Sequence, residues 1–247
     1  MTMDINNRFP NFDLKDRAEI AWSNTWVEHA PDLSRKRFLI IGDSVPRDYR
    51  GSLAKFLPGY SVDFIGSSSI FEDTLLYDLC DMVFKENIYH WSFVILALGG
   101  NHGLNLQTHN NQEDSTRYKK SLNVFIDYLQ QRFNDVLIIN TAPNRLSQNL
   151  KKYDENVNRE ISSRNLIMQQ IASERGLKDY IDLYDYVMQN GFKFKDPRHF
   201  KDKKTQEKIA CFIINRLCKC GLLKNEDMSV KPQKTLLQKL LKIFTGK

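Results

Sequence analysis

Five short apolar runs alternate along the chain with longer segments of helical periodicity. The run at residues 93–98 is apolar throughout, which is typical of a strand buried on both faces. Strands that alternate with helices form a parallel sheet covered by helices on both sides. We therefore expect an α/β protein with three layers, α/β/α, and a five-stranded parallel sheet. The expected strands are residues 37–41, 60–65, 92–98, 135–141 and 177–183.

Helical patterns and stop signals fill the intervals between these runs. The first helix should end at Leu57-Pro58-Gly59, because proline and glycine terminate helices. Ahead of the first strand, residues 1–35 read as a lead-in that packs on the domain. A helix over residues 14–29 would carry Trp22 and Trp26 on one face. The expected core helices are residues 46–57, 72–87, 116–133, 156–175 and 202–220, with a helical turn at 184–189.

Length and composition favour one medium-sized domain, residues 36–222, followed by a short appendage, residues 223–247. The net charge of +6 is gathered late in the chain, and no nucleic-acid-binding motif accompanies it, so we expect no nucleic-acid partner. The four cysteines have neither zinc-ribbon nor Cys-x-x-Cys spacing and read as reduced thiols. The first residues lack the basic start and apolar core of a signal peptide, which favours a cytoplasmic protein.

Residues 234–247 form a basic amphipathic pattern. Its leucines and a phenylalanine fall on one helical face, and its lysines lie mostly off that face. Such a segment suits an anchor at an anionic membrane surface or a site for a protein partner. A terminal helix docked on its own domain explains the same pattern. If the segment is an anchor, the protein lies peripherally at the inner membrane.

Candidate catalytic residues follow the expected strands. Ser44 comes directly after the first strand, in Gly42-Asp43-Ser44, where open α/β sheets bind ligands. The same tripeptide also suits an ordinary turn, and Asp43 fits the side-chain-to-backbone bond of such a turn. A serine hydroxyl needs a base, and His199 is a candidate. Asp196, three residues earlier, would orient the imidazole.

An oxyanion formed during acyl transfer needs preorganised hydrogen-bond donors. The backbone N–H groups of Ser44 and Gly66 and the side-chain amide of Asn101 are candidates, because each follows an expected strand. The carboxyl ends of parallel strands share one edge of a sheet. We therefore expect these donors to converge with Asp196 and His199.

Four short blocks of the sequence resemble the SGNH (GDSL-type) hydrolase superfamily. They are Gly42-Asp43-Ser44, Gly66, Gly99-Gly-Asn-His102 and Asp196-Pro-Arg-His199, in the order that this family shows. The resemblance implies a flavodoxin-like fold and hydrolysis of esters, often O-acetyl groups on carbohydrates. It implies Ser44 as nucleophile, His199 as base, Asp196 as its orienting acid, and an oxyanion hole from Ser44, Gly66 and Asn101. It implies no metal and no organic cofactor.

The sequence departs from the family pattern in two places. His102 stands where the third block usually has aspartate, and Val45 follows Ser44 where leucine is common. His102 is either a substrate contact or a hydrogen-bonded loop anchor. Arg47 and Arg198 flank the predicted site, where they either bind an anionic sugar or phosphate or are solvated. Asn144 and Arg145, after the fourth strand, are expected at the rim of the cleft.

Our leading interpretation is a serine esterase that removes an acyl group, O-acetyl in particular, from a carbohydrate or polysaccharide precursor. An O-acetyltransferase acting on surface polysaccharide would use the same Ser-His-Asp site, with a sugar hydroxyl replacing water as the acceptor. A non-enzymatic alternative is an inactive carbohydrate-binding module. The presence of Ser44, Asp196 and His199 together argues against that alternative.

Overall fold

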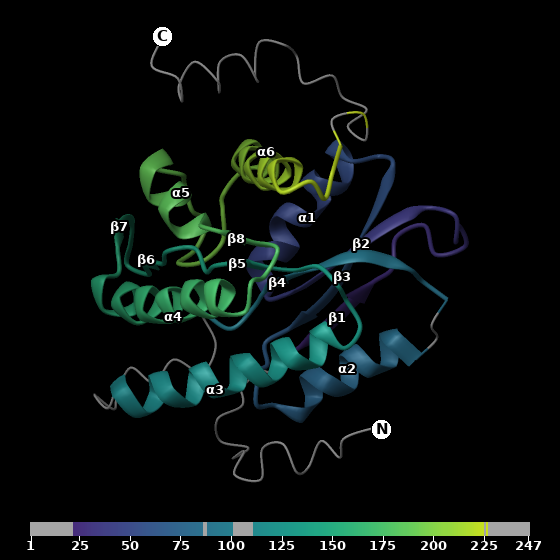
Figure 1. Cartoon of the computed structure of the whole chain (residues 1–247). Coiled ribbons are helices and arrows are strands. Elements are labelled where there is room, and N and C mark those ends of the chain that lie inside the picture. The colour runs from purple at the N-terminus through teal and green to yellow at the C-terminus, as the bar shows by residue number, and fades with distance from the viewer. Residues whose placement is uncertain (1–21, 86–87, 101–110, 225, 227–247) are drawn as a thin grey trace.

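A computed structural model of the chain describes residues 22–85, 88–100, 111–224 and 226. Within these residues the protein is a three-layer α/β/α sandwich around a six-stranded sheet (Figure 1). The strands lie in the order β1-β3-β2-β4-β5-β8. They are β1 Ser23–Trp26, β2 Lys36–Gly42, β3 Tyr60–Ser67, β4 Trp91–Ala97, β5 Val136–Ile139 and β8 Asp179–Ile181.

The five expected parallel strands are all present, and they run in the doubly wound order of flavodoxin-like folds. The chain passes from β2 to β3, which lies on one side of β2, and then to β4, which lies on the other side of β2. This reversal places the topological switch point between β2 and β4, at the carboxyl end of β2. Ligands of open α/β sheets bind at such a point.

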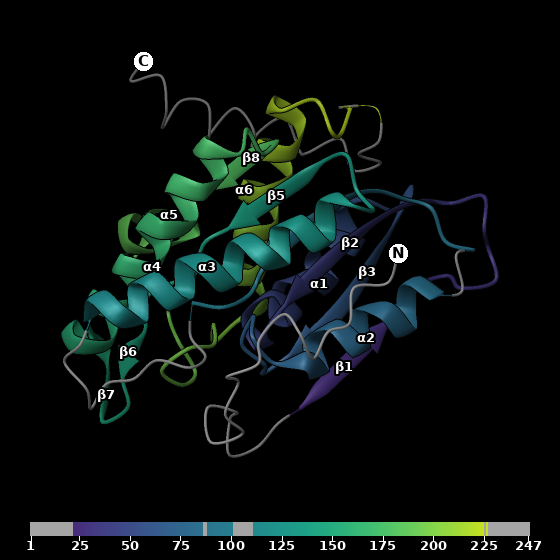
Figure 2. The ribbon, with the colours of Figure 1, turned by 60° about the horizontal axis from the view of Figure 1, so that its bottom comes forward.

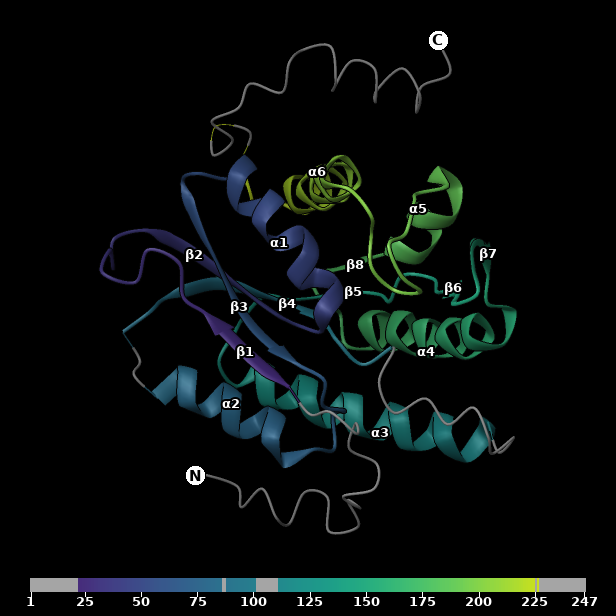
Figure 3. The same cartoon turned by 180° about the vertical axis from the view of Figure 1, so that it is seen from behind.

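The sixth strand corrects the sequence-based prediction at two points. Residues 23–26 form β1, which pairs antiparallel with β3 at the edge of the sheet, and not part of a helix (Figure 3). The sheet therefore has six strands and is mixed. Trp22 and Trp26 are four residues apart, and this even spacing puts side chains on one face of a strand as it does on one face of a helix. Trp26 packs on Phe64 of β3 with ring centroids 5.4 Å apart.

The helices divide between the two faces of the sheet, with α1, α5 and α6 on one side and α2, α3 and α4 on the other (Figures 1 and 2). Near the sheet, β6 and β7 form a separate two-stranded hairpin. The helices are α1 Ser44–Phe56, α2 Thr74–Lys85, α3 Asn111–Gln130, α4 Glu155–Glu174, α5 Leu183–Asn190 and α6 Lys203–Lys219. The hairpin strands are β6 Arg145–Leu146 and β7 Asn149–Tyr153.

Strand β2 joins the two hydrophobic cores. Phe38 and Ile40 point to the core under α1 and α6, whereas Leu39 and Ile41 point to the core over α2 and α3. All four side chains are fully buried. This explains why residues 38–41 of β2 are all apolar, since both faces of the strand are covered there.

The amino ends of the parallel strands carry a buried ion pair. The guanidinium of Arg37 lies 3.1 Å from Asp63 Oδ2, and both side chains are 1% exposed. Arg37 also donates to the backbone carbonyls of Glu28, His29 and Asp32. These bonds tie the segment after β1 to the sheet, on the end opposite to Ser44.

The predicted appendage at residues 234–247 lies outside the described residues. Among the helices that the structure describes, none is both long enough and apolar enough to cross a bilayer. The four cysteines are free thiols, with Cys80 buried in the core.

Candidate active site

Ser44 is the first residue of α1, directly past the carboxyl end of β2. Asp43 caps this helix, and its Oδ1 accepts a 2.9 Å hydrogen bond from the Val45 N–H. The predicted turn-forming role of Asp43 is therefore confirmed. The N–H groups in the first turn of a helix have no partner within the helix. Ser44 thus presents a hydroxyl and a backbone donor at the positive end of α1.

Gly42 permits the tight approach of α1 to the sheet. A Cβ atom at this position would lie 2.3 Å from Pro46 Cγ and 3.2 Å from the Ala97 carbonyl oxygen. Real Cβ atoms do not approach other heavy atoms as closely as 2.3 Å. A side chain at residue 42 would therefore push α1 away from β4 and displace the Ser44 hydroxyl.

The loop at residues 193–201 carries Asp196 and His199. Phe194 and Phe200 pair as an isolated antiparallel bridge, and their buried rings are 5.0 Å apart. The Lys195 N–H donates to the His199 carbonyl at 2.9 Å. The loop is therefore a closed, hairpin-like turn with aromatic side chains at its base.

Two further contacts fix this loop against its neighbours. The Arg145 N–H donates to the Pro197 carbonyl at 2.8 Å, which joins the loop to β6. Lys195 Nζ lies 3.3 Å from Asp48 Oδ2, which joins it to α1. The loop thus spans the space between the serine-bearing helix and the β6–β7 hairpin.

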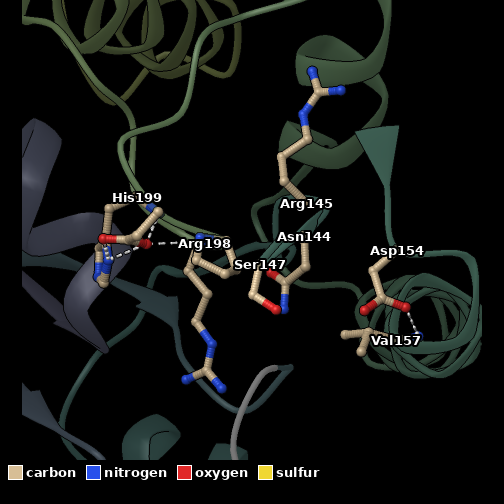
Figure 4. Close-up of a pocket in the computed structure, with 9 residues that line it drawn as sticks. Asn144, Arg145, Ser147, Asp154, Val157, Arg198 and His199 are labelled. Carbon is tan, nitrogen blue, oxygen red and sulfur yellow. Dashed lines mark hydrogen bonds and ion pairs between the residues drawn. The ribbon is translucent and has the colours of Figure 1, made fainter. Parts of the chain in front are cut away.

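Ser44, His199 and Asp196 form one continuous hydrogen-bonded chain. Ser44 Oγ lies 2.7 Å from His199 Nε2. His199 Nδ1 lies 2.8 Å from Asp196 Oδ2 and 2.9 Å from Oδ1 (Figure 4). These distances suit proton transfer from a serine hydroxyl to an imidazole whose other nitrogen is held by a carboxylate.

The environment of Asp196 keeps its carboxyl group ionised. Partial burial opposes ionisation, but hydrogen bonds from the N–H groups of Arg198 and His199, each 2.9 Å, outweigh it. The His199 ring adds to the same effect, and the pKa of Asp196 is lowered below its ordinary value. An ionised Asp196 can accept a hydrogen bond from the Nδ1–H group and would stabilise an imidazolium at His199.

The structure places two of the three predicted oxyanion donors. The Ser44 N–H lies at the start of α1, beside its own hydroxyl. Gly66 lies inside β3, where it is in register with Gly42 of β2 and Asn24 of β1. The third predicted donor, Asn101, lies outside the described residues, as does His102.

The pairing of β1 bears on the predicted role of Gly66. The Ser68 N–H donates to the Trp22 carbonyl at 3.1 Å. Hydrogen-bonded pairs alternate in an antiparallel ladder, so the next such pair is Gly66 with Asn24. This register pairs Gly66 with β1, and its oxyanion role stays a prediction. The glycine itself makes room for packing, because a Cβ there would lie 2.3 Å from a ring carbon of Phe64.

The two predicted substrate-binding arginines have different surroundings. Arg47 lies one turn after Ser44 on α1, and its guanidinium lies over the Trp22 ring, 5.4 Å from the centroid. Arg198 is exposed, and the structure shows no partner for its guanidinium among the described residues. Arg198 lines a pocket beside the triad, whereas Arg47 does not line this pocket.

This pocket contains residues that the motifs did not single out. Ser147, Asp154 and Val157 line it together with Asn144. Asn144 was expected at the rim, and its side chain lies in the pocket wall. Arg145 was expected there too, but its guanidinium turns away and packs 3.5 Å from the Tyr153 ring centroid (Figure 4). The sequence signal for these added residues was weak, because they come from the segment around β6 and from the start of α4, which carry no motif.

The described residues contain no cluster of three or more His, Cys, Asp or Glu side chains that suits a metal ion. The triad residues already bond one another, and each polar atom that would bind a metal has a partner in the chain. The site holds the groups that acyl transfer would require: a serine hydroxyl, an imidazole, a carboxylate and a helix N-terminus.

No protein-family model matches the sequence, and no curated protein is similar enough in sequence to match it. Solved structures do match. An acetyl xylan esterase shares 18% identity with a TM-score of 0.56, over 73% of this chain and 99% of that one. An acylhydrolase from Bacteroides fragilis shares 13% identity with a TM-score of 0.52, over 78% and 94% of the two chains.

A GDSL-like lipase from Bacteroides thetaiotaomicron is similar to the same extent, with 15% identity and a TM-score of 0.51 over 76% of this chain and 91% of that one. The sequence identities are low, so the likeness concerns the fold. The match covers nearly the full length of each of these structures. Together with the strand order and the placement of Ser44 at the end of β2, it shows that the chain has the SGNH (GDSL-type) hydrolase fold.

Proposed function

We propose that this protein is a serine esterase that removes an acyl group, O-acetyl in particular, from a carbohydrate. The observation that carries the proposal is the continuous chain Ser44–His199–Asp196, with contacts of 2.7 and 2.8 Å. The fold supports the reaction class, because the similar structures include an acetyl xylan esterase and an acylhydrolase.

The first half of the reaction acylates the serine. Ser44 Oγ attacks the ester carbonyl carbon while His199 Nε2 takes the hydroxyl proton, and the carbonyl oxygen becomes an oxyanion. The Ser44 N–H, at the positive end of α1, is placed to stabilise that charge. The tetrahedral intermediate then collapses. The bond to the alcohol oxygen breaks, and the Nε2 proton passes to that oxygen as the alcohol leaves.

The second half restores the enzyme. A water molecule gives a proton to His199 Nε2 and attacks the acyl carbon, and the new tetrahedral intermediate expels Ser44 Oγ. The proton returns to Ser44, and the carboxylic acid leaves. Asp196 accepts a hydrogen bond from Nδ1 throughout, so that Nε2 faces the serine in both halves.

Hydrolysis of p-nitrophenyl acetate by wild type and by Ser44→Ala tests the proposal. We expect the variant to lose about four to six orders of magnitude in kcat, as when the nucleophile of a serine triad is removed. Its melting temperature should match that of wild type, because Ser44 is partly exposed. Equal rates for the two proteins would overturn the proposal.

A further inference from the structure

A pocket of about 290 Å³ opens beside the triad. Asp196, Arg198 and His199 form one wall, and the other wall comes from the segment around β6 and from the start of α4 (Figure 4). Ligand pockets commonly measure roughly 300–1,000 Å³, so this one is at the small end of the range. It has room for a single ring-sized group, and its shared wall makes it continuous with the catalytic centre.

Asn144 supplies a polar group in this pocket, its side-chain amide, that has no hydrogen-bond partner among the described residues. The residue is only 6% exposed, and no described residue bonds its side-chain amide. Its backbone, by contrast, is held firmly. The N–H donates to Asn158 Oδ1 at 2.7 Å, and the carbonyl accepts from Asn158 Nδ2 at 2.8 Å and from the Asp154 N–H at 3.1 Å. Buried polar groups normally have partners, so a free amide on a fixed backbone indicates a ligand.

The other polar groups of the pocket are mixed in character. Arg198 contributes a guanidinium, Ser147 a hydroxyl and Asp154 a carboxylate whose Oδ1 also caps α4. The guanidinium of Arg145 is turned out of the pocket, where it bonds the Lys151 and Phe192 carbonyls. The pocket therefore offers donors and acceptors together. A group with several hydroxyls matches this set, because each hydroxyl both donates and accepts.

We infer that this pocket binds the alcohol half of the ester as a single pyranose-sized sugar ring, with Asn144 as the residue that selects it. The inference rests on the proposed esterase function. The Arg145 N–H to Pro197 carbonyl bond places this wall beside the catalytic loop. A ring held there has its ester oxygen near His199, which protonates the leaving alcohol. An alkyl chain in the same place would leave the amide of Asn144 without a partner.

The test compares two acetate esters on the same protein. One is p-nitrophenyl acetate, and the other is an O-acetylated methyl pyranoside, with acetate release measured for both. We expect Asn144→Ala to lower kcat/KM for the sugar ester about tenfold or more, as for the loss of one or two substrate hydrogen bonds. The rate with p-nitrophenyl acetate should fall much less, because a nitro group is a weak acceptor and cannot donate a hydrogen bond to Asn144.

Two further variants serve as controls for this experiment. Asn156→Ala changes an exposed asparagine on the first turn of α4, outside the pocket, and should alter neither rate. Ser147→Ala changes an exposed pocket residue, so that folding is preserved, and should lower the rate with the sugar ester more than the rate with p-nitrophenyl acetate. In wild type, the free methyl pyranoside should inhibit p-nitrophenyl acetate hydrolysis competitively, and Asn144→Ala should relieve that inhibition.

The outcomes separate the inference from the proposed function. If wild type hydrolyses p-nitrophenyl acetate but no acetylated pyranoside, the sugar pocket is wrong and the esterase stands. If neither ester is hydrolysed, the esterase fails as well. An Asn144→Ala protein that keeps full activity on the sugar ester, or loses both activities equally at an unchanged melting temperature, would also overturn the inference.

Discussion

Two aspartates at opposite ends of the sheet accept similar sets of hydrogen bonds but lie in different environments. Asp63, toward the amino ends of the strands, accepts from Arg37, from the Trp91 indole at 2.7 Å and from the Glu28 N–H at 2.9 Å. Asp196, at the carboxyl ends, accepts from a histidine ring and two backbone N–H groups. The side chain of Asp63 is 1% exposed and that of Asp196 is 42% exposed.

The difference in exposure fits two different roles, a structural role for Asp63 and a role in the proposed reaction for Asp196. The hydrogen-bond partners of Asp63 are groups of the fold itself, so its charge holds β1 and the following segment to the sheet. Asp196 lies beside His199, whose charge changes during each catalytic cycle of the proposed mechanism. Solvent exposure lowers the free-energy cost of that change in charge, because water and the backbone N–H groups stabilise the charged side chains. We therefore expect substitutions at Asp196 to alter rate, and substitutions at Asp63 to alter stability.

The largest effect should come from Asp196→Asn. An amide in place of the carboxylate no longer holds the imidazole in the required tautomer, and kcat should fall by about three to four orders of magnitude. The free energy of unfolding should change little, because the group is partly exposed. The measurements are p-nitrophenyl acetate hydrolysis and urea unfolding.

Asp202→Asn is the matched control for that experiment. Asp202 caps α6 close to the same loop, and its Oδ1 accepts from the Thr205 N–H at 2.8 Å. Asparagine also caps helices well, so both rate and stability should be retained. A comparable loss of activity in Asp202→Asn would mean that any loss of negative charge near the loop at residues 193–201 abolishes activity. The role of Asp196 in orienting His199 would then lose its support.

The second largest effect should come from Asp63→Ala. Removal of one partner from a buried ion pair leaves the Arg37 charge uncompensated, which costs about 3–5 kcal/mol. The unfolding midpoint in urea should drop accordingly. The kcat of the protein that remains folded should match wild type, because the triad lies at the other end of β2. A large loss of kcat in fully folded protein would contradict the division between the two ends.

A double substitution sharpens the same point. Arg37→Met with Asp63→Leu removes both buried charges, and such replacements are often neutral or stabilising. The double variant should therefore be more stable than Asp63→Ala by about 2 kcal/mol or more. If it is less stable, the bonds from Arg37 to the carbonyls of Glu28, His29 and Asp32 matter more than the ion pair does.

The smallest effect concerns pH and stability. The pKa of Asp196 is lowered in the folded protein, so its ionised form stabilises the fold. This contribution is present above the ordinary pKa of 3.8 and is lost as the pH falls through the lowered pKa. Thermal unfolding of wild type and Asp196→Asn should differ slightly at pH 7 and converge as the pH falls below 3.8. A gap that widens on acidification would reverse the sign we assign.

Much of the site was predictable because its chemistry depends on residue type. Ser44, Asp196 and His199 stand where a serine nucleophile, its base and an acid can meet at the end of a parallel sheet, and the structure brings them together. The five parallel strands were predictable for a similar reason, since each is a short apolar run between helical patterns. Residue types and local sequence patterns were therefore enough to predict the triad and the five parallel strands.

The remaining features depend on partners distant in the sequence. Trp22 and Trp26 have a spacing that fits a helix face or a strand face, and only pairing with β3 decides for the strand. Arg37 and Asp63 read as ordinary charged residues inside strands until the fold buries them together. The side-chain amide of Asn144 is exceptional because no residue that the structure describes bonds it, and no sequence pattern can reveal this.

The most direct test of the account is covalent labelling of the nucleophile. Wild type, Ser44→Ala and His199→Ala would each be treated with a fluorophosphonate, which phosphonylates activated serines and releases fluoride. Peptide mass spectrometry then locates the adduct. We predict one adduct per wild-type chain, on Ser44, with none on Ser44→Ala and a much slower reaction with His199→Ala. An adduct on another serine, or equal labelling of the Ser44→Ala protein, would contradict the assignment of Ser44.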